Sequence, residues 1–175
     1  MKSLLLTSAL VLPLAAGAAF AAGGGNETAP SKPKCKIGQV YDKNSKTCVS
    51  SSNSGLDADA LYENLRELAH AERYEDAKLV IAQMPENDDR ALTYLGFINR
   101  KMGDFDKAMV YYERALEVNP ANILARSYMG QGFITQDKLP EAIEQLRAIW
   151  EYDGRGTWAE VSLRNAIDTG ETYSY

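Results

Sequence analysis

The sequence predicts an all-α fold: a helix-turn-helix repeat solenoid of about three units with a C-terminal capping helix, preceded by a small hairpin stapled by two cysteines. Three observations predict it. From Leu56 onward, apolar residues recur at three- and four-residue steps, as they do along one face of a helix. Residues 89–120 hold two such stripes with Gly103 between them, and similar segments flank this unit. Repeat arrays usually bind other molecules along a surface.

Composition limits the size of the core and the kind of ligand. The 175 residues, 45% of them hydrophobic, are enough for one ordinary domain. A formal net charge of −5 provides no basic face for a phosphate backbone, which needs cationic side chains to release its counterions. We therefore expect no nucleic-acid partner.

Residues 1–22 are predicted to form a signal peptide. Lys2 precedes the apolar run 4–14, and residues 19–21 have the A-x-A form that signal peptidase accepts. A membrane-spanning anchor is the weaker alternative, because Pro13 interrupts the run and a span needs about 20 apolar residues. We expect export to the periplasm, or else to the extracellular space, and a chain that does not span the membrane.

Residues 23–34 form a predicted flexible linker, because glycine and proline disfavour a helix and nothing apolar is available to bury. In residues 35–49, two short β-prone pieces flank a turn, which predicts a hairpin. Export would place Cys35 and Cys48 in an oxidising compartment, where such a pair forms a disulfide. The closed loop is short, so the chain-entropy treatment gives about 3 kcal/mol of local stabilisation. Residues 50–55 are a second predicted linker.

Other roles for the cysteine pair have less support. The twelve residues between Cys35 and Cys48 (48 minus 35 minus 1) do not match the C-x-x-C spacing of redox centres. A zinc site needs about four ligands, and the single histidine, His70, lies in a helical pattern far downstream. The segment resembles the C-x-x-G-x-x-Y/W-D…C pattern of small carbohydrate-binding modules through Cys35, Gly38, Tyr41, Asp42 and Cys48. That resemblance implies a glycan ligand as the alternative to a structural staple.

The central unit resembles the tetratricopeptide repeat. The matching positions are Leu92-x-x-Leu95-Gly96-x-x-Asn99 in its first helix, and Ala108-x-x-x-Tyr112, Ala115 and Pro120 in its second. Asn99 replaces an expected aromatic residue. Gly96 and Ala108 are small enough to let two helices approach closely. The resemblance implies a stack of helix pairs. Together with the predicted signal peptide, it suggests an exported bacterial member of this family.

Less regular copies of the central unit lie on both sides of it. Ala77 precedes Ala108 by 31 residues (108 minus 77), and Ala142 follows it by 34 (142 minus 108). After the third copy, Thr157 opens an S/T-x-x-E capping box, which predicts a final helix that covers the last repeat. The repeat domain is thus predicted to span residues 56–168, and residues 169–175 form a loose tail.

A binding groove is expected on the first helices of the units. The resemblance implies that positions facing away from the partner helix line a concave surface. These positions carry aromatic and arginine side chains, which dominate binding hot spots. The candidate groove residues are Tyr62, Arg66, Arg90, Tyr94, Phe97, Arg100, Lys101, Tyr128 and Gln131. The alternative for any one of them is an ordinary packing or surface role.

This groove is more basic than the whole chain, so we expect its ligand to be a peptide or helix segment of a partner protein with acidic or C-terminal carboxylate character. The sequence holds no G-x-S-x-G, H-E-x-x-H, P-loop or dinucleotide-binding motif. We therefore expect a non-catalytic adaptor of the cell envelope, with no cofactor and no metal. The alternative is a cell-wall protein that binds glycan through the 35–49 hairpin.

Overall fold

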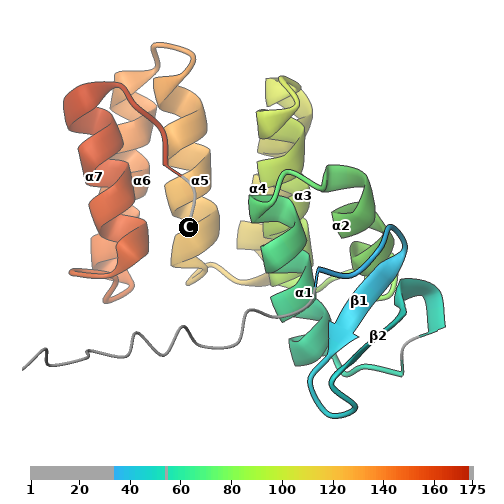
Figure 1. Cartoon of the computed structure of the whole chain (residues 1–175). Helices are drawn as coiled ribbons and strands as arrows, with labels where there is room; N and C mark the ends of the chain where they lie inside the picture. Colours follow the sequence, from blue (N-terminus) through green and yellow to red (C-terminus); the bar gives the residue numbers. More distant parts are fainter. Residues whose placement is uncertain (1–33, 54, 174–175) are drawn as a thin grey trace, which may run out of the picture. The chain divides into compact units, whose positions relative to one another are not determined.

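A computed structural model of the chain describes residues 34–53 and 55–173, which belong to one compact unit (Figure 1). The predicted signal peptide 1–22 and all of the predicted linker 23–34 except Lys34 lie outside the described residues. The described part is mostly helical, with a two-stranded hairpin at its start, so the predicted fold class is confirmed. The elements are β1 (Gln39–Asp42), β2 (Thr47–Ser50), a 3-10 turn (Ser51–Asn53), α1 (Ala58–His70), α2 (Tyr74–Ile81), α3 (Asp89–Lys101), α4 (Phe105–Val118), α5 (Ile123–Ile134), α6 (Leu139–Glu151) and α7 (Trp158–Thr169).

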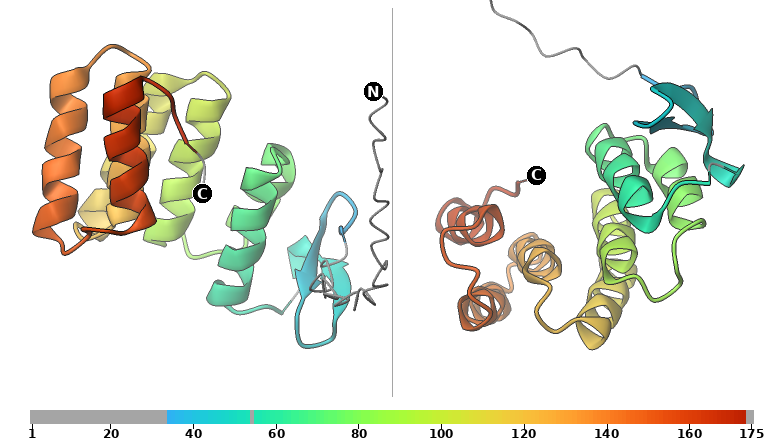
Figure 2. Two further views of the ribbon diagram at one scale, coloured as in Figure 1. Left: turned by 60° about the vertical axis from the view of Figure 1, so that its left-hand side comes forward. Right: turned by 90° about the horizontal axis from the view of Figure 1, so that it is seen from below.

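The first six helices form three pairs. Helices α1 and α2, α3 and α4, and α5 and α6 pack against each other within a pair, and α7 packs on both α5 and α6. The first helices of successive pairs, α1, α3 and α5, also contact one another along the array. Seen from below, the helix pairs follow one another in chain order around an arc (Figure 2). This is the stack of helix pairs, closed by one further helix, that the repeat pattern predicts.

The first helix of each pair, and α7, begins at a side-chain cap. Asp57, Asp88, Asn122 and Thr157 each accept a hydrogen bond from the backbone N–H three residues further on. Their spacings are 31 (88 minus 57), 34 (122 minus 88) and 35 (157 minus 122) residues. An uncapped first turn would leave its N–H groups unpaired. The caps therefore fix where each repeat starts and place α7 in the position of a fourth first helix.

The turn inside each pair has one conformation in all three repeats. Gly103, Glu72 and Asp137 occupy the left-handed region, with φ of 87°, 59° and 57°. The next N–H in each case bonds to the carbonyl five residues earlier, at 2.9 to 3.0 Å. Glycine adopts this conformation at little cost, whereas other residues are strained there. The central unit is thus the only one of the three described turns with the favoured residue.

Gly96 on α3 lets that helix lie directly against the Tyr112 ring of α4. A Cβ at this position would be 2.5 Å from Cδ1 of Tyr112, whose side chain is fully buried. The close approach expected from Gly96 is therefore present. Its counterpart Gly130 faces a different neighbour, because there a Cβ would meet Leu163 of α7 at 2.7 Å. The final helix thus packs into the third repeat as closely as α4 packs on α3.

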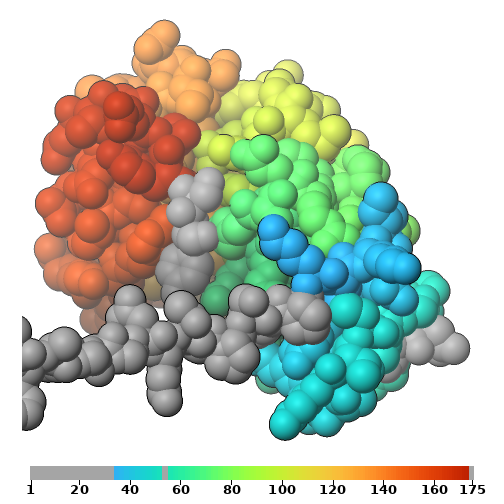
Figure 3. Space-filling view, viewed as in Figure 1, coloured from blue at the N-terminus to red at the C-terminus, as the bar shows by residue number. Residues whose placement is uncertain are grey.

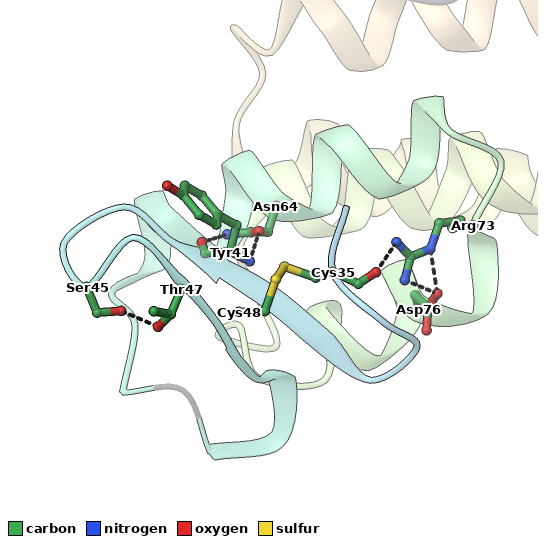
Figure 4. The surroundings of a disulfide bond; sticks show 8 residues. All are labelled: Cys35, Tyr41, Ser45, Thr47, Cys48, Asn64, Arg73 and Asp76. Carbon is green, nitrogen blue, oxygen red and sulfur yellow. Dashed lines mark hydrogen bonds and ion pairs between the residues drawn. A yellow bond between two sulfur atoms is a disulfide. The ribbon is translucent and has the colours of Figure 1, made fainter. Parts of the chain in front are cut away.

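The predicted hairpin and its disulfide are confirmed. Strands β1 and β2 pair antiparallel, with Tyr41 opposite Cys48, and Cys35 is bonded to Cys48 (Figure 4). Asp42 holds the turn by accepting hydrogen bonds from the backbone N–H groups of Asn44 and Ser45. These carboxylate contacts, led by the Ser45 hydroxyl, lower the pKa of Asp42. The disulfide and the turn together close the loop.

The hairpin packs on α1 and α2 (Figures 3 and 4). The Asn64 side-chain amide donates to the Tyr41 carbonyl at 3.0 Å and accepts from the Tyr41 N–H at 2.8 Å, as a neighbouring strand would. Arg73 donates to the Cys35 carbonyl at 2.9 Å, and Asp76 accepts from the N–H of Gly38 at 3.1 Å. Hairpin, α1 and α2 therefore form one continuous packed end of the array.

The predicted linker 50–55 contains an ordered turn. Ser51–Asn53 form a 3-10 turn, and Ser51 is buried. Both the backbone N–H and the hydroxyl of Ser51 donate to the carbonyl of Gly38, at 2.9 and 3.0 Å. A serine-rich composition favours a flexible segment, but these two hydrogen bonds hold it against the hairpin.

We expect Gly96→Ala to lower the free energy of unfolding by about 2 kcal/mol, because the new methyl group overpacks the Tyr112 ring. Chemical denaturation checks this. In a Tyr112→Leu background the same substitution should cost much less, since the ring it meets is gone. Equal costs in both backgrounds would show that the contact is not the cause.

Asn64→Ala should destabilise the packing of the hairpin on α1 by about 2 kcal/mol, because two hydrogen bonds to Tyr41 are lost. Hydrogen exchange of the Tyr41 amide should accelerate to match. Asn44→Ala, at the exposed hairpin turn, is the matched control and should leave both quantities unchanged. An unaltered Tyr41 exchange rate in Asn64→Ala would contradict the contact.

Candidate functional site

One aromatic ring from each of α1, α3, α5 and α7 forms a continuous ladder along the inner helices. The centroid of Tyr62 lies 5.9 Å from that of Tyr94, Tyr94 lies 6.2 Å from Tyr128, and Tyr128 lies 6.0 Å from Trp158. All three contacts are edge-to-face, the arrangement that the ring quadrupole favours. The two inner rings, Tyr94 and Tyr128, are fully buried. The ladder therefore joins the first helices of all the repeats to α7.

The two ends of the ladder line the same cavity, which we call the groove pocket. It has a volume of about 320 Å³ and lies among the first turns of α5 and α7 and the faces of α1 and α3. Its walls are mainly apolar, with one cation. The lining residues are Tyr62, Arg66, Tyr94, Ile123, Leu124, Thr157, Trp158 and Ala159. A cavity of this size and lining accepts one large apolar or aromatic side chain and places a negative group near Arg66.

Arg90 lines a neighbouring cavity of about 300 Å³ and is held by two carboxylates. Its guanidinium donates to Asp59 at 2.7 Å and to Asp88 at 2.9 Å, and it lies 4.9 Å from the centroid of the Tyr62 ring. Burial alone would raise the pKa of Asp88, but hydrogen bonds from Arg90 and from the Ala91 N–H lower it. The hydrogen bonds that Arg90 donates to Asp88 and Asp59 in turn raise its own pKa. Because these two carboxylates hold Arg90 against the Tyr62 ring, Arg90 helps to position that ring.

Basic side chains gather where α1 and α3 end. Burial lowers the pKa of His70, and the charges of Arg66 and Lys101 lower it further. The Nε2 atom of His70 lies 3.1 Å from the hydroxyl of Tyr94. Arg100 lies over the rings of Phe97 and Tyr128 at 5.8 and 5.9 Å. We call this group of side chains the basic end; its cations could attract an acidic group of a ligand.

A third cavity, of about 320 Å³, opens beside the basic end. Its lining joins the ends of α3 and α5 to the segment that follows α7. The residues are Arg100, Lys101, Gly103, Phe105, Thr135, Gln136 and Thr172. The Nε atom of Arg100 is buried and makes no hydrogen bond within the part of the chain that the structure describes. A polar ligand group in this cavity would meet two cations.

The structure separates the nine predicted groove residues into two sets. Those that line a cavity are Tyr62, Arg66, Arg90, Tyr94, Arg100 and Lys101. Phe97, Tyr128 and Gln131 are at most 1% exposed and lie in the interior. Besides its partner in the pair, α3 contacts α1 and α5, and α5 contacts α3 and α7. A side chain that faces away from the partner helix can therefore be buried against the next repeat. Tyr94 belongs to both environments, because its buried ring forms part of a cavity wall.

Trp158 and Thr157 line the groove pocket but are predicted only as parts of the capping helix. The signal that would have found them is the cap spacing of 35 residues between Asn122 and Thr157 (157 minus 122). It places Trp158 where Ile123 stands in the third repeat, at the first turn of an inner helix. A helix that begins like the first helix of a repeat also contributes to the repeat surface.

Residues 90–122 match the profile of the tetratricopeptide repeat, which covers α3, α4 and the turn before α5. The chain therefore contains a tetratricopeptide repeat. Repeats of this family are generally protein–protein interaction modules without catalytic activity. Comparison with curated proteins finds no match for the chain.

Within residues 34–53 and 55–173, no group of three or more His, Cys, Asp or Glu side chains could hold a metal ion. None of the helices in these described residues is long and apolar enough to cross a membrane.

Acidification should destabilise the protein through His70. Because its pKa is lowered by folding, the unfolded chain binds a proton near the ordinary pKa of 6.5 and the folded chain only at lower pH. Stability therefore falls as the pH falls through this range. Between about pH 7.5 and about pH 5.5, the wild type should lose more unfolding free energy than His70→Gln, as measured by urea denaturation. Equal losses would contradict the role of His70.

Proposed function

We propose that the protein is a non-catalytic adaptor of the cell envelope that binds a peptide or helix segment of a partner protein in the concave groove. The observation that carries this proposal is the groove pocket, because one cavity collects side chains from α1, α3, α5 and α7. A site assembled from every repeat requires the whole array. The tetratricopeptide repeat also suggests that the partner is a protein.

The lining of the groove pocket suggests which part of a partner it takes. Tyr62, Leu124 and Trp158 offer apolar and aromatic surface, which stabilises a buried apolar anchor. Arg66 on the same wall and Lys101 beyond it favour an acidic group next to that anchor. The proposed ligand is therefore a segment with one large apolar side chain and a nearby carboxylate.

The groove is suited to binding because its walls are fixed before the ligand arrives. The aromatic ladder sets the separation of the inner helices, and the two carboxylates that bind Arg90 hold Tyr62 in place. Ordering side chains during association costs about 0.5–1.5 kcal/mol for each one. A wall that is already ordered avoids most of this cost.

Two features support a location in the cell envelope. The Cys35–Cys48 disulfide fits an oxidising compartment such as the periplasm. The apolar run 4–14 with its A-x-A site fits a secretory signal.

The contacts of the hairpin with Asn64, Arg73 and Asp76 support a role as the N-terminal cap of the array in preference to an independent glycan-binding module.

The proposal is tested by photo-crosslinking in the native cell. A photoreactive phenylalanine derivative in place of Tyr62 should give one dominant adduct with another protein, because this position lines the groove pocket. The same group in place of Val110, which is 54% exposed on α4, should not give that adduct. Equal yields of the adduct from both positions would refute binding in the groove.

The crosslinked adduct also tests the charge. Adding Arg66→Ala to the Tyr62 variant should reduce the adduct about tenfold, equivalent to about 1.4 kcal/mol of binding free energy. Arg147→Ala, which removes an exposed arginine on α6, is the matched control and should leave the yield unchanged. A loss that is equal in the two variants would indicate a general effect of charge and not a groove contact.

A further inference from the structure

The segment after α7 bonds to the predicted groove residue Gln131. Gly170, in the left-handed region with φ of 77°, ends α7 and turns the chain back toward the inner helices (Figures 1 and 2). The backbone N–H of Tyr173 then donates to Oε1 of Gln131 at 2.6 Å. Residues 170–173, predicted as part of a loose tail, are thus attached to the repeat domain at a specific acceptor.

A chain of buried hydroxyl groups fixes which way the Gln131 amide points. Nε2 of Gln131 donates to Oγ of Ser127 at 3.3 Å, and the Ser127 hydroxyl is 3.0 Å from that of Ser162. Because Ser162 itself donates to the Ala159 carbonyl at 3.2 Å, its oxygen is left to accept from Ser127. Donors and acceptors alternate along this chain, so the amide nitrogen faces inward and Oε1 faces the tail.

Oε1 of Gln131 needs a donor from outside the helix. Gln131 and Ser127 are both fully buried, and a buried carbonyl oxygen without a partner is destabilising. The Tyr173 N–H supplies the donor in this structure. A main-chain N–H carries no side-chain identity, so any extended segment can present one. Gln131 is therefore suited to hold the backbone of a peptide.

The charge around this acceptor limits the kind of segment it holds. Thr172, the residue before the bonded N–H, lies in the third cavity with Arg100 and Lys101. The tail segment carries Glu171 and no cation. An extended segment with acidic and hydroxyl-bearing residues is thus complementary to the surroundings of Gln131, whereas a basic segment is not.

We propose that Gln131 is a main-chain acceptor for extended, acidic peptides, and that the tail of this chain occupies it as an internal ligand that a partner must displace. This inference rests on the proposed function and deepens it by naming the ligand class and a competitor. A tethered tail acts at an effective concentration on the order of millimolar. Partner binding is therefore weakened by the tail without any change in the groove itself.

The experiment uses the tail as its own probe. A synthetic, fluorescently labelled peptide of residues 170–175 is titrated into the full chain and into a chain that stops after Gly170, which keeps all seven described helices and the α7 cap. The peptide should bind the shortened chain at least about tenfold more tightly than the full chain. No binding to the shortened chain at about 1 mM, or equal binding to both chains, would overturn the proposal.

The role of the main-chain N–H is tested without altering the protein. An N-methyl group on the nitrogen of Tyr173 in the peptide removes the donor and should weaken binding to the shortened chain about fivefold. The matched control carries the N-methyl group at Thr172, which makes no hydrogen bond through that nitrogen among the described residues. Equal losses for both peptides would exclude the Gln131 contact.

A variant of the full chain completes the test. Gln131→Ala should release the tail and raise the hydrogen exchange rate of the Tyr173 amide about tenfold, whereas Gln83→Ala, at an exposed position after α2, should not. An unchanged rate in Gln131→Ala would overturn the proposal. These readouts need no partner, so a failed crosslink at Tyr62 would refute the proposed function and leave tail docking to be judged on its own.

Discussion

The aromatic ladder is the contact on which the rest of the structure depends. A stack of helix pairs has few interactions that connect distant repeats, since each repeat contacts only its neighbours. Here Tyr62, Tyr94, Tyr128 and Trp158 meet edge-to-face at 5.9 to 6.2 Å across four helices. Each such contact is worth about 0.5–1.5 kcal/mol beyond area burial. The ladder thus sets the spacing of the inner helices, and with it the width of the groove pocket between its two end rings.

Both ends of the array are closed, and each by a different device. At the start, the hairpin satisfies the polar groups of α1 and α2 through Asn64, Arg73 and Asp76. Its Val40 packs into the core of the array, and the disulfide closes its loop. At the end, α7 packs so closely on α5 that Gly130 has no room for a side chain beside Leu163. Terminal repeats need such covers, because an exposed repeat face is apolar. Both ends of the array are therefore covered, and the proposed ligand would bind along its side.

Much of the fold follows from local patterns in the sequence, but the surroundings of the candidate site do not. Helices and turns can be located from signals that act within a few residues. These signals are the spacing of apolar residues, the glycine at position 103 and the capping box that begins at Thr157. A periodic pattern also shows which face meets the partner helix, as at Gly96. It does not show which face meets the next repeat, so Phe97, Tyr128 and Gln131 are predicted at the surface and found inside. The docking of the hairpin and of the tail depends on a few long-range hydrogen bonds, such as those between Asn64 and Tyr41 and the one from Tyr173 to Gln131. These bonds leave no periodic pattern in the sequence.

The geometry of α5 relates the groove pocket to the main-chain acceptor. Leu124 lines the pocket at the first turn of α5, and Gln131 follows it by seven residues on the same helix (131 minus 124). Seven residues of α-helix span about 10 Å. An extended chain covers that distance in about three residues. A ligand that places an apolar anchor in the pocket and donates to Gln131 would therefore carry the anchor about three residues from the donating N–H. A helical segment would need about seven residues for the same span, and its N–H groups beyond the first turn would already be bonded within the helix. The proposed acceptor at Gln131 would therefore favour an extended ligand.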